Sequence, residues 1–581
     1  MKTNSNNSSI SYMQLLEFKL VFPDEIPLSV DEYLKGSNRG DILNAASHFL
    51  GFNPNNSKIL DNREFLSNFF CAENNDLANY VYGVIKNIEK TGTKVGVINP
   101  YSSLSLFECC YKNEEKEETQ SNSDFEINLF KAYLVLNSQF TSKQKIAFTS
   151  TQDLHPLLIN PMELFCMQYP LADKVNYDIN RIWVNQMLKA THLFVFLESN
   201  EKTAPLLKAF LEFFNKKNWQ DFLKSLLPLT NPMKYADNEG FIDFGVNKND
   251  DFQGSCLFIE KFIVDENDSF DENDFLSIRG KPFYKVEDGV YRVIFPLFVV
   301  EKIFKGLYFY LSEVNKTLDK PFGNIKSFYG GEFSENILLY NVMGSIWNNK
   351  CCKFSGKQIS EMKIDGFIDY YVRKGKNILL FESKDFLIKA DKKASFDFNI
   401  YEKEFKKLLY YEDMPNGKRK PKAVIQLINS IRKILRREFA ADKDYKYREV
   451  NIYPILIIHD SQYDVPGFNF LINYWFQQEI ASLKEEGVYT HNIKPLVVIN
   501  IDSLLYYQVA LAENTPLHNI INQYEIQTKG SINDKSGFDN KKFDKYIPFS
   551  YFIDDFFKNK GIAKFPPLLD FVAPLLFSND K

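Results

Sequence analysis

Residues 363–385, KIDGFIDYYVRKGKNILLFESKD, decide the fold of this chain because they carry the pattern of a β-hairpin. Apolar residues are frequent on both arms, and residues 374–377 (KGKN) have the composition of a turn. If the hairpin closes symmetrically about that turn, Val372 lies opposite Leu379. The stretch therefore predicts two antiparallel strands with a defined register.

The same register places Asp369 directly opposite Glu382. Side chains alternate across a strand, so Lys384 lies on the same face as Glu382. Residues 378–381 (ILLF) are all apolar, which indicates a buried strand. We therefore expect two carboxylates and a lysine to converge where this strand ends.

Like charges that face each other across two strands destabilise a sheet, and a bound metal cation would remove that cost. Carboxylate oxygens at this density favour Mg²⁺ or Mn²⁺ over zinc. A lysine beside a metal-bound water suits phosphoryl chemistry, because it orients the water and stabilises charge that grows on the phosphate. The hairpin thus predicts a metal-dependent hydrolytic site.

The spacing of these residues resembles a known motif. Asp369, then twelve residues, then Glu382-Ser383-Lys384 is similar to the motif of the PD-(D/E)xK (restriction-endonuclease-like) nuclease superfamily. The proline of the family name is missing, since Ile368 stands before Asp369. The resemblance implies that Asp369, Glu382 and the backbone carbonyl of Ser383 bind the metal, and that Lys384 acts on the attacking water.

Asp365 is a second candidate for the first acid of the motif. It lies on the same strand face as Asp369, but four residues away, which is roughly 13 Å along an extended strand. Only Asp369 faces Glu382 in the predicted register. We therefore favour Asp369 as the metal ligand and expect Asp365 to contribute indirectly.

The resemblance covers roughly residues 330–460 and implies an α/β core with the element order αβββαβ. In this family a helix before the hairpin carries a glutamate that points at the metal. Residues 332–347 have a helical pattern after Gly330-Gly331, so we assign that role to Glu335, with Glu332 as second choice. The alternative is that both acids only favour the positive end of a helix.

A basic helix is predicted after the hairpin, over residues 418–439. Residues 415–450 contain eleven Lys and Arg against four Asp and Glu, in a chain whose net charge is −5. A helical face opposite the apolar stripe holds Lys422, Gln426, Lys433 and Arg437. A helix with a glutamine and basic residues directly after the hairpin resembles the family, in which the glutamine or a basic residue assists at the active site. We expect these four residues to bind nucleic acid, although a solvated helix face explains the pattern too.

The length of 581 residues predicts several domains. We expect a mostly α-helical N-terminal domain (1–235), a mixed α/β connecting subdomain (236–325), the nuclease-like domain (326–512) and a C-terminal tail that packs on the body (513–581). The chain has seven cysteines without zinc-site spacing, no signal-peptide pattern and no apolar run of membrane-spanning length. These features favour a cytoplasmic protein that does not enter a membrane.

These observations give two hypotheses of function. The first is a Mg²⁺-dependent endonuclease that acts on nucleic acid, with DNA as the expected substrate. Its helical N-terminal half would be a sensor or would bind a protein partner, by analogy with bacterial anti-phage defence effectors. The second is a catalytically inactive nuclease fold that serves as a scaffold for nucleic acid or a partner protein.

Overall fold

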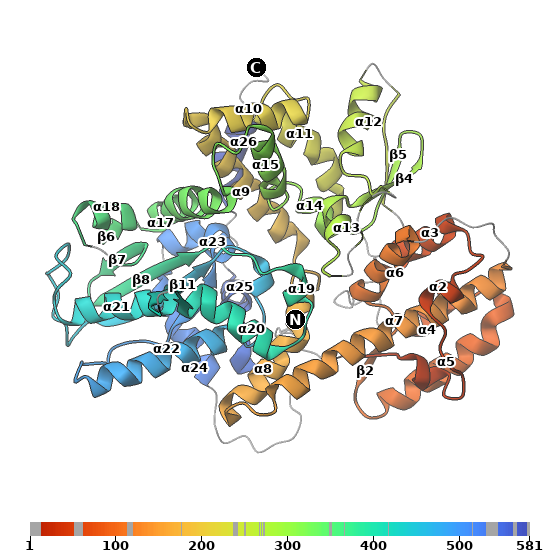
Figure 1. The fold of residues 1–581 in the computed structure, drawn as a ribbon, viewed down its shortest axis with the longest axis horizontal. Coiled ribbons are helices and arrows are strands. Elements are labelled where there is room, and N and C mark those ends of the chain that lie inside the picture. Colours follow the sequence, from red (N-terminus) through yellow and green to blue (C-terminus); the bar gives the residue numbers. More distant parts are fainter. Residues whose placement is uncertain are drawn as a thin grey trace.

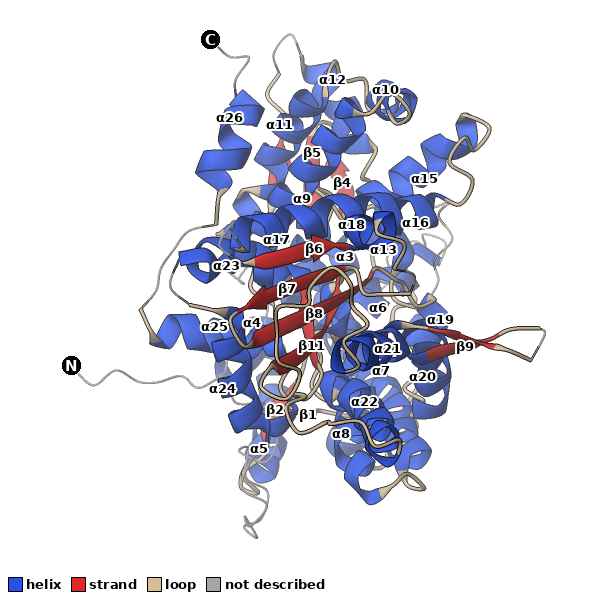
Figure 2. Cartoon of the chain, turned by 90° about the vertical axis from the view of Figure 1, so that its left-hand side faces the viewer, coloured by secondary structure: helices blue, strands red, loops and turns tan. Residues whose placement is uncertain are grey.

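Five strands form a mixed sheet in the part of the chain after residue 350 (Figure 2). Among the residues 13–577 the computed structural model describes all but 51–61, 113–119, 176, 236–241, 249–250, 266–267, 269, 271–272, 348–350, 365, 416, 514, 530–543 and 562–565. The strands are β6 (Cys352–Ser355), β7 (Tyr370–Lys374), β8 (Asn377–Lys384), β11 (Asn451–Ile458) and β12 (Val497–Asn500). Their order is β12-β11-β8-β7-β6, with β8, β11 and β12 parallel and the other pairs antiparallel. The expected mixed α/β class is confirmed, and the assignment to a nuclease core stays a prediction.

The predicted hairpin is present with the predicted register. Val372 pairs with Leu379, and Lys374 pairs with Asn377 across the turn. Gly375 has a φ of 59°, a left-handed conformation that glycine adopts without steric cost. Symmetric closure about the predicted turn was therefore enough to set the pairing.

Both faces of the sheet are buried, because helices cover each of them. Leu379 and Phe381 belong to the core beneath one face, and Leu380 lies in a separate core beneath the other. The first face is covered by α9 (Ile179–Ser199), α17 (Tyr340–Ile346), α23 (Ile501–Glu513), α24 (Leu517–Lys529) and α25 (Phe549–Asn559). The second is covered by α8 (Pro156–Gln168), α20 (Phe398–Phe405), α21 (Ala423–Leu435) and α22 (Phe468–Glu485).

A separate lobe at the right of Figure 1 is built from N-terminal helices around their own core. Its elements are β1 (Met13–Leu15), α1 (Phe18–Val21), α2 (Val30–Tyr33), α3 (Arg39–Leu50), α4 (Asn62–Phe69), α5 (Asn75–Glu89), β2 (Lys94–Gly96), α6 (Pro100–Lys112) and α7 (Asn122–Thr151). Helix α7 joins the lobe to the sheet region, since Phe130 lies in the lobe's core and Ala147 in the core shared with α8. One continuous helix therefore belongs to two hydrophobic cores.

Short elements connect the lobe to the central sheet. A three-stranded sheet has the order β3-β5-β4, and Asp288-Gly289 lies at the turn of its β4–β5 hairpin. The elements are α10 (Ala204–Phe213), α11 (Trp219–Thr230), β3 (Asp243–Gly245), α12 (Phe252–Glu260), α13 (Leu276–Gly280), β4 (Phe283–Glu287), β5 (Val290–Val293), α14 (Pro296–Val300), α15 (Leu307–Thr317) and α16 (Ile325–Phe328). A π-helical segment, η4 (Tyr329–Leu339), then leads into α17.

The basic helix expected over residues 418–439 is shorter than predicted. Residues Arg419–Pro421 form strand β10, which pairs with β9 (Tyr411–Asp413), and α21 begins only at Ala423. The two strands make a ribbon that projects from the body (Figure 2). At the other end α21 stops at Leu435, and Arg437 has a φ of 59°, outside the helical range. Lys422 and Arg437 therefore lie outside the helix, and the predicted four-residue helical face is wrong at both ends.

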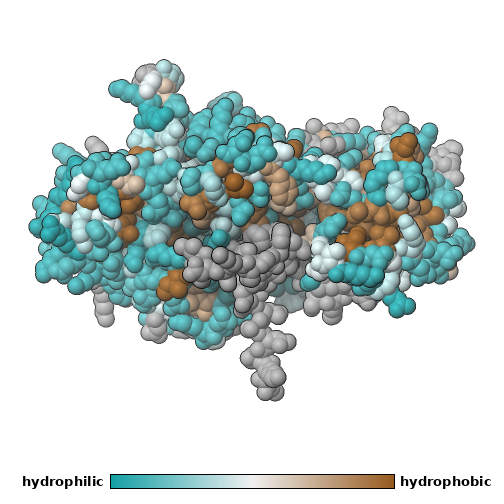
Figure 3. Space-filling view, turned by 90° about the horizontal axis from the view of Figure 1, so that it is seen from below, coloured by the Kyte–Doolittle hydropathy of each residue, from teal (hydrophilic) through white to brown (hydrophobic). Residues whose placement is uncertain are grey.

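The surface seen from below is mainly hydrophilic, with its larger hydrophobic patch on the side of the N-terminal lobe (Figure 3). Exposed apolar side chains of that lobe include Ile26 and Leu28. No helix in the described ranges is both long enough and apolar enough to cross a lipid bilayer.

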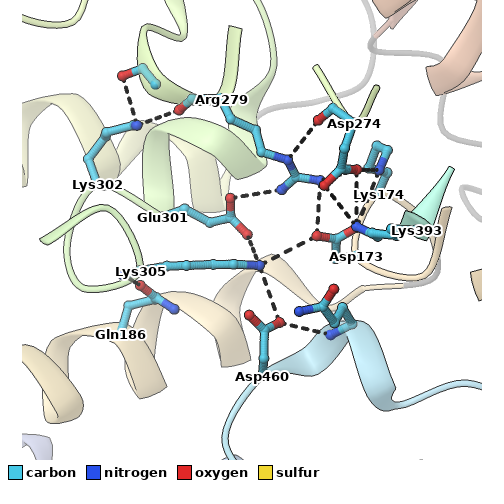
Figure 4. Close-up of polar contacts among 12 residues, drawn as sticks. Asp173, Lys174, Gln186, Asp274, Arg279, Glu301, Lys302, Lys305, Lys393 and Asp460 are labelled. Atoms are coloured by element: carbon cyan, nitrogen blue, oxygen red, sulfur yellow. Dashed lines mark hydrogen bonds and ion pairs between the residues drawn. The ribbon is translucent and has the colours of Figure 1, made fainter. Parts of the chain in front are cut away.

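A buried network of ion pairs joins the segment after α8 to α13, to the segment after α14 and to residues that follow β8 and β11 (Figure 4). Asp173, which follows α8, is 5% exposed and lies 2.8 Å from Lys393 Nζ and 2.9 Å from Arg279 Nη2. Lys174 donates to Asp274 Oδ1 at 2.5 Å. The surrounding cations hold the pKa of Asp173 well below its usual range despite its burial.

Strained backbone helps to position this network. Asp274 and Phe275 have φ values of 68° and 57°, and a left-handed conformation is uncommon for residues other than glycine. Phe275 is 1% exposed, so packing of its ring compensates for the backbone cost. The result is that Asp274 faces both Lys174 and Lys393.

We predict that Asp173→Ala lowers the free energy of unfolding by about 3–5 kcal/mol, because Lys393 and Arg279 lose a buried acceptor. Urea denaturation at neutral pH measures the change. Asp153→Ala, at an exposed position between α7 and α8, is the control and should change it by less than about 0.5 kcal/mol.

The depressed pKa of Asp173 sets the pH dependence of this difference. The stabilisation is present above the pKa of an unfolded aspartate, about 4, and is lost as pH falls towards the folded-state pKa. The free energies of unfolding of the wild type and of Asp173→Ala should therefore become equal in acid. An equal destabilisation by Asp173→Ala and Asp153→Ala would show that the network does not stabilise the fold.

Candidate active site at the end of the central hairpin

Asp369 lies one residue before β7, where backbone contacts fix its position. Its N–H donates to the Phe381 carbonyl at 3.1 Å, and its Oδ2 accepts from the Ser383 N–H at 2.7 Å. Gly356 N–H donates to the Asp369 carbonyl at 2.6 Å, and a Cβ at Gly356 would lie 3.2 Å from Asp369 Cα. A side chain at this position would push Asp369 by a few tenths of an ångström, so the position of Asp369 is sensitive to a residue that does no chemistry.

Phe381 pairs with Tyr370, so the next residue of β8, Glu382, lies at the position opposite Asp369. The Glu382 side chain is fully buried, and its Oε1 lies 2.5 Å from Lys384 Nζ. Oε2 has no hydrogen-bond partner among the described residues. A buried carboxylate oxygen without a partner carries a large desolvation cost, which a bound cation would remove.

Glu335 reaches this site from the π-helical segment η4. Burial and the charge of Asp369 raise the pKa of Glu335 to about 8. Burial and Asp369 likewise raise the pKa of Glu382 to about 8, although Lys384 acts in the opposite direction. Lys384 itself keeps its charge, because Glu382 and Asp369 raise its pKa. Glu332, the second choice, is exposed on the same segment.

These contacts bring together the four residues that the sequence pattern singled out: Glu335, Asp369, Glu382 and Lys384. Asp365, the other candidate for the first acid, lies outside the described residues. The predicted contact of the Ser383 carbonyl with a metal stays a prediction. Within the described ranges, no three His, Cys, Asp or Glu side chains are grouped closely enough to hold a metal ion.

The structure adds two side chains that the sequence did not indicate. Tyr340 lies near the cluster, since the charges of Glu335 and Asp369 add to the burial that raises its pKa to about 12. Its position five residues after Glu335 suits the wider turn of a π-helix, which a 3.6-residue pattern does not indicate. His459 Nε2 lies 2.8 Å from Ser383 Oγ, and burial lowers the pKa of this histidine.

The predicted nucleic-acid-binding residues are spread over different local structures. Gln426 and Lys433 lie within α21, while Lys422 precedes it and lies 2.8 Å from Glu412 of β9. Arg437 is exposed beyond the end of the helix. A phosphate that binds Lys422 must therefore compete with an existing ion pair.

No family of known proteins, no curated protein and no solved structure matches this chain. The interpretation of the site therefore rests on the geometry and chemistry of the residues themselves.

The raised pKa values predict an unusual pH dependence for the metal-free protein. A carboxyl group whose folded-state pKa lies above its unfolded value destabilises the fold as it ionises. Thermal melts in a chelator should therefore show a melting temperature that falls as pH rises from about 5 to about 8. Glu382→Gln should flatten this slope and raise the melting temperature at the alkaline end.

Glu361→Gln is the control, because Glu361 is exposed on α18 (Gly356–Glu361). It should reproduce the wild-type slope. An identical pH slope in Glu382→Gln and the wild type would mean that Glu382 is ionised in the metal-free protein.

Proposed function

We propose that this chain is a metal-dependent nuclease that hydrolyses phosphodiester bonds, with DNA as the expected substrate and Mg²⁺ or Mn²⁺ as the cofactor. The observation that carries the proposal is the cluster of three carboxylates beside a lysine at the end of a buried strand. Three buried acidic groups beside one lysine cost stability, either as uncompensated charge or as groups that must stay protonated, so a structural role alone gives no reason for them. The element order around the cluster, with helices before β6 and between β8 and β11, agrees with the proposal.

The residues of the cluster have the donor chemistry that a hard divalent cation requires. Asp369, Glu382 and Glu335 would have to move closer together to hold it, because no three such side chains of the described residues are grouped closely enough for a metal ion. The unpartnered Oε2 of Glu382 is the oxygen most in need of a cation. When bound, such a cation lowers the pKa of a coordinated water and neutralises charge on phosphate oxygens. Glu335 and Glu382 would have to lose their protons first, because carboxylates bind metals in the ionised form.

Lys384 has a different role from the carboxylates. Its ammonium group is fixed by Glu382, and the side chain as a whole is 24% exposed, so we expect it to contact a substrate at the surface of the cluster. It would position the attacking water and donate to the phosphate oxygen on which charge accumulates. Gln426, Lys433, Lys422 and Arg437 would hold the nucleic-acid backbone, and the helical N-terminal half would bind a regulator or partner, as in anti-phage defence effectors.

We predict that Lys384→Ala abolishes Mg²⁺-dependent cleavage while nucleic-acid binding changes little, because the lysine acts on the water and the transition state. Cleavage of plasmid, linear, single-stranded and RNA substrates is compared in Mg²⁺ and in EDTA. Lys389→Ala, which removes an exposed lysine from the loop after β8, is the matched control and should cleave normally. Cleavage at the wild-type rate by Lys384→Ala would remove this lysine from the mechanism. Binding without cleavage of any substrate by the wild type would instead favour the scaffold hypothesis.

A further prediction concerns the protons of the cluster. Mg²⁺ binding near neutral pH should release protons, because two carboxyl groups with pKa values of about 8 must ionise. Calorimetric titrations in two buffers of different ionisation enthalpy measure the number released. Asp369→Asn should abolish both the binding and the Mg²⁺-induced rise in melting temperature. If Asp369→Asn keeps them, Asp365 is the first metal ligand.

A further inference from the structure

A second site is indicated by a cavity of about 760 Å³ at the carboxyl ends of the parallel strands. Asp385 follows β8, Asp460 follows β11, and Asn500 ends β12, and all three line the cavity. Helix α9 supplies part of the opposite wall. None of the residues of the carboxylate cluster lines it. Ligands of α/β proteins commonly bind outside the carboxyl ends of parallel strands, and volumes of about 300–1,000 Å³ are typical of small-molecule sites.

The charges that line this cavity are mostly negative. Nine carboxylate residues and five basic residues contribute to its wall. Three of the basic groups are already matched with wall carboxylates, Arg181 with Asp554, Lys189 with Asp502 at 2.7 Å, and Lys305 with Asp460 at 3.3 Å. Asp173 and Glu301 are matched too, by Lys393 and Arg279. The wall still carries more acidic than basic groups, which disfavours phosphate-bearing ligands.

Two acceptors on the wall indicate what a ligand would have to supply. Asn185 on α9 is 2% exposed, and its Oδ1 has no hydrogen-bond partner among the described residues. Asp464, in the segment after β11, accepts from Asn500 Nδ2 at 2.7 Å, and burial raises its pKa to about 7. A buried acceptor without a donor is costly, so a molecule that donates hydrogen bonds would be stabilised here.

Aromatic side chains complete the wall and suit the same kind of ligand. Tyr308, Tyr329, Tyr551 and Phe304 line the cavity. The Phe304 ring already lies 4.9 Å from Lys189 Nζ, a distance at which a cation and a ring attract each other. Acceptors, carboxylates and aromatic rings together favour an organic ammonium group.

We propose that this cavity binds a small polyamine, that is, a flexible aliphatic chain with two or more ammonium groups. Asp464 and Asn185 Oδ1 accept its N–H donors, and the tyrosine rings cover its methylene groups. The site is separate from the carboxylate cluster, and this proposal does not depend on nuclease activity.

The test uses spermidine as the probe and the full chain in about 150 mM salt, which screens attraction to exposed charges. Calorimetry should show one spermidine per chain, and melts should show stabilisation. Asp464→Asn and Asn185→Leu should each weaken binding about tenfold or more, since each removes an acceptor for a charged donor. Asp24→Asn, which removes the same charge from an exposed loop, is the matched control and should bind normally.

Other results would overturn the proposal. Equal binding by all variants would mean that spermidine binds the acidic surface in general. Stabilisation by ATP and not by spermidine would mean that the cavity takes anions, and no effect of either would mean that it takes neither. Hydrogen exchange on the wild type gives a readout that does not depend on variants folding. Spermidine should protect amides in the segments 385–388 and 460–466, and unchanged exchange in both segments would exclude binding at this place.

Discussion

Asp173 is the buried acceptor on which the arrangement of this chain depends. Its carboxylate contacts basic groups from three other segments, with Lys393 after β8, Arg279 in α13 and Lys305 after α14. A single buried carboxylate cannot be stable without such partners, and each partner needs the carboxylate in turn. The segments must therefore fold against one another together. Lys305 also contacts Asp460, at the end of β11, so the network holds one of the strand ends of the sheet.

In two groups of buried acids in this molecule the pKa values shift in opposite directions. In the network around Asp173 the cations are sufficient, and the pKa of the carboxyl group falls. In the cluster around Glu382 one lysine serves three carboxylates, and the pKa values of Glu335 and Glu382 rise. Around Asp173 the fold supplies a basic group for each buried acid, so the shortage of basic groups at the cluster is not a general property of the protein's core. This contrast is the physical reason to expect a cation at the cluster.

The sequence predicted local pairing well and long-range assembly poorly. The hairpin register followed from symmetric closure about one turn, which is a property of a short segment. The N-terminal end of α21 could not be predicted in this way. Residues Arg419–Pro421 pair with β9 in a two-stranded ribbon, and helical periodicity does not indicate such a pairing. Tyr340 was missed because a π-helical segment changes which residues share a face. The cavity was missed for a different reason, since Asn185, Asp385 and Asp464 are brought together only by the fold.

The alternation of side chains along β8 separates the two candidate sites. Glu382 and Lys384 contribute to the carboxylate cluster, while Asp385 lines the cavity and Ser383 Oγ contacts His459, which lines it too. The same division occurs in η4, where Glu335 contributes to the cluster and Ser334 donates to Asp385 at 2.5 Å. Adjacent residues of a strand point to opposite faces, so two sites can share one strand end without sharing a side chain. A substitution that removes an acceptor from one site therefore leaves the side chains of the other in place, and the two can be altered independently.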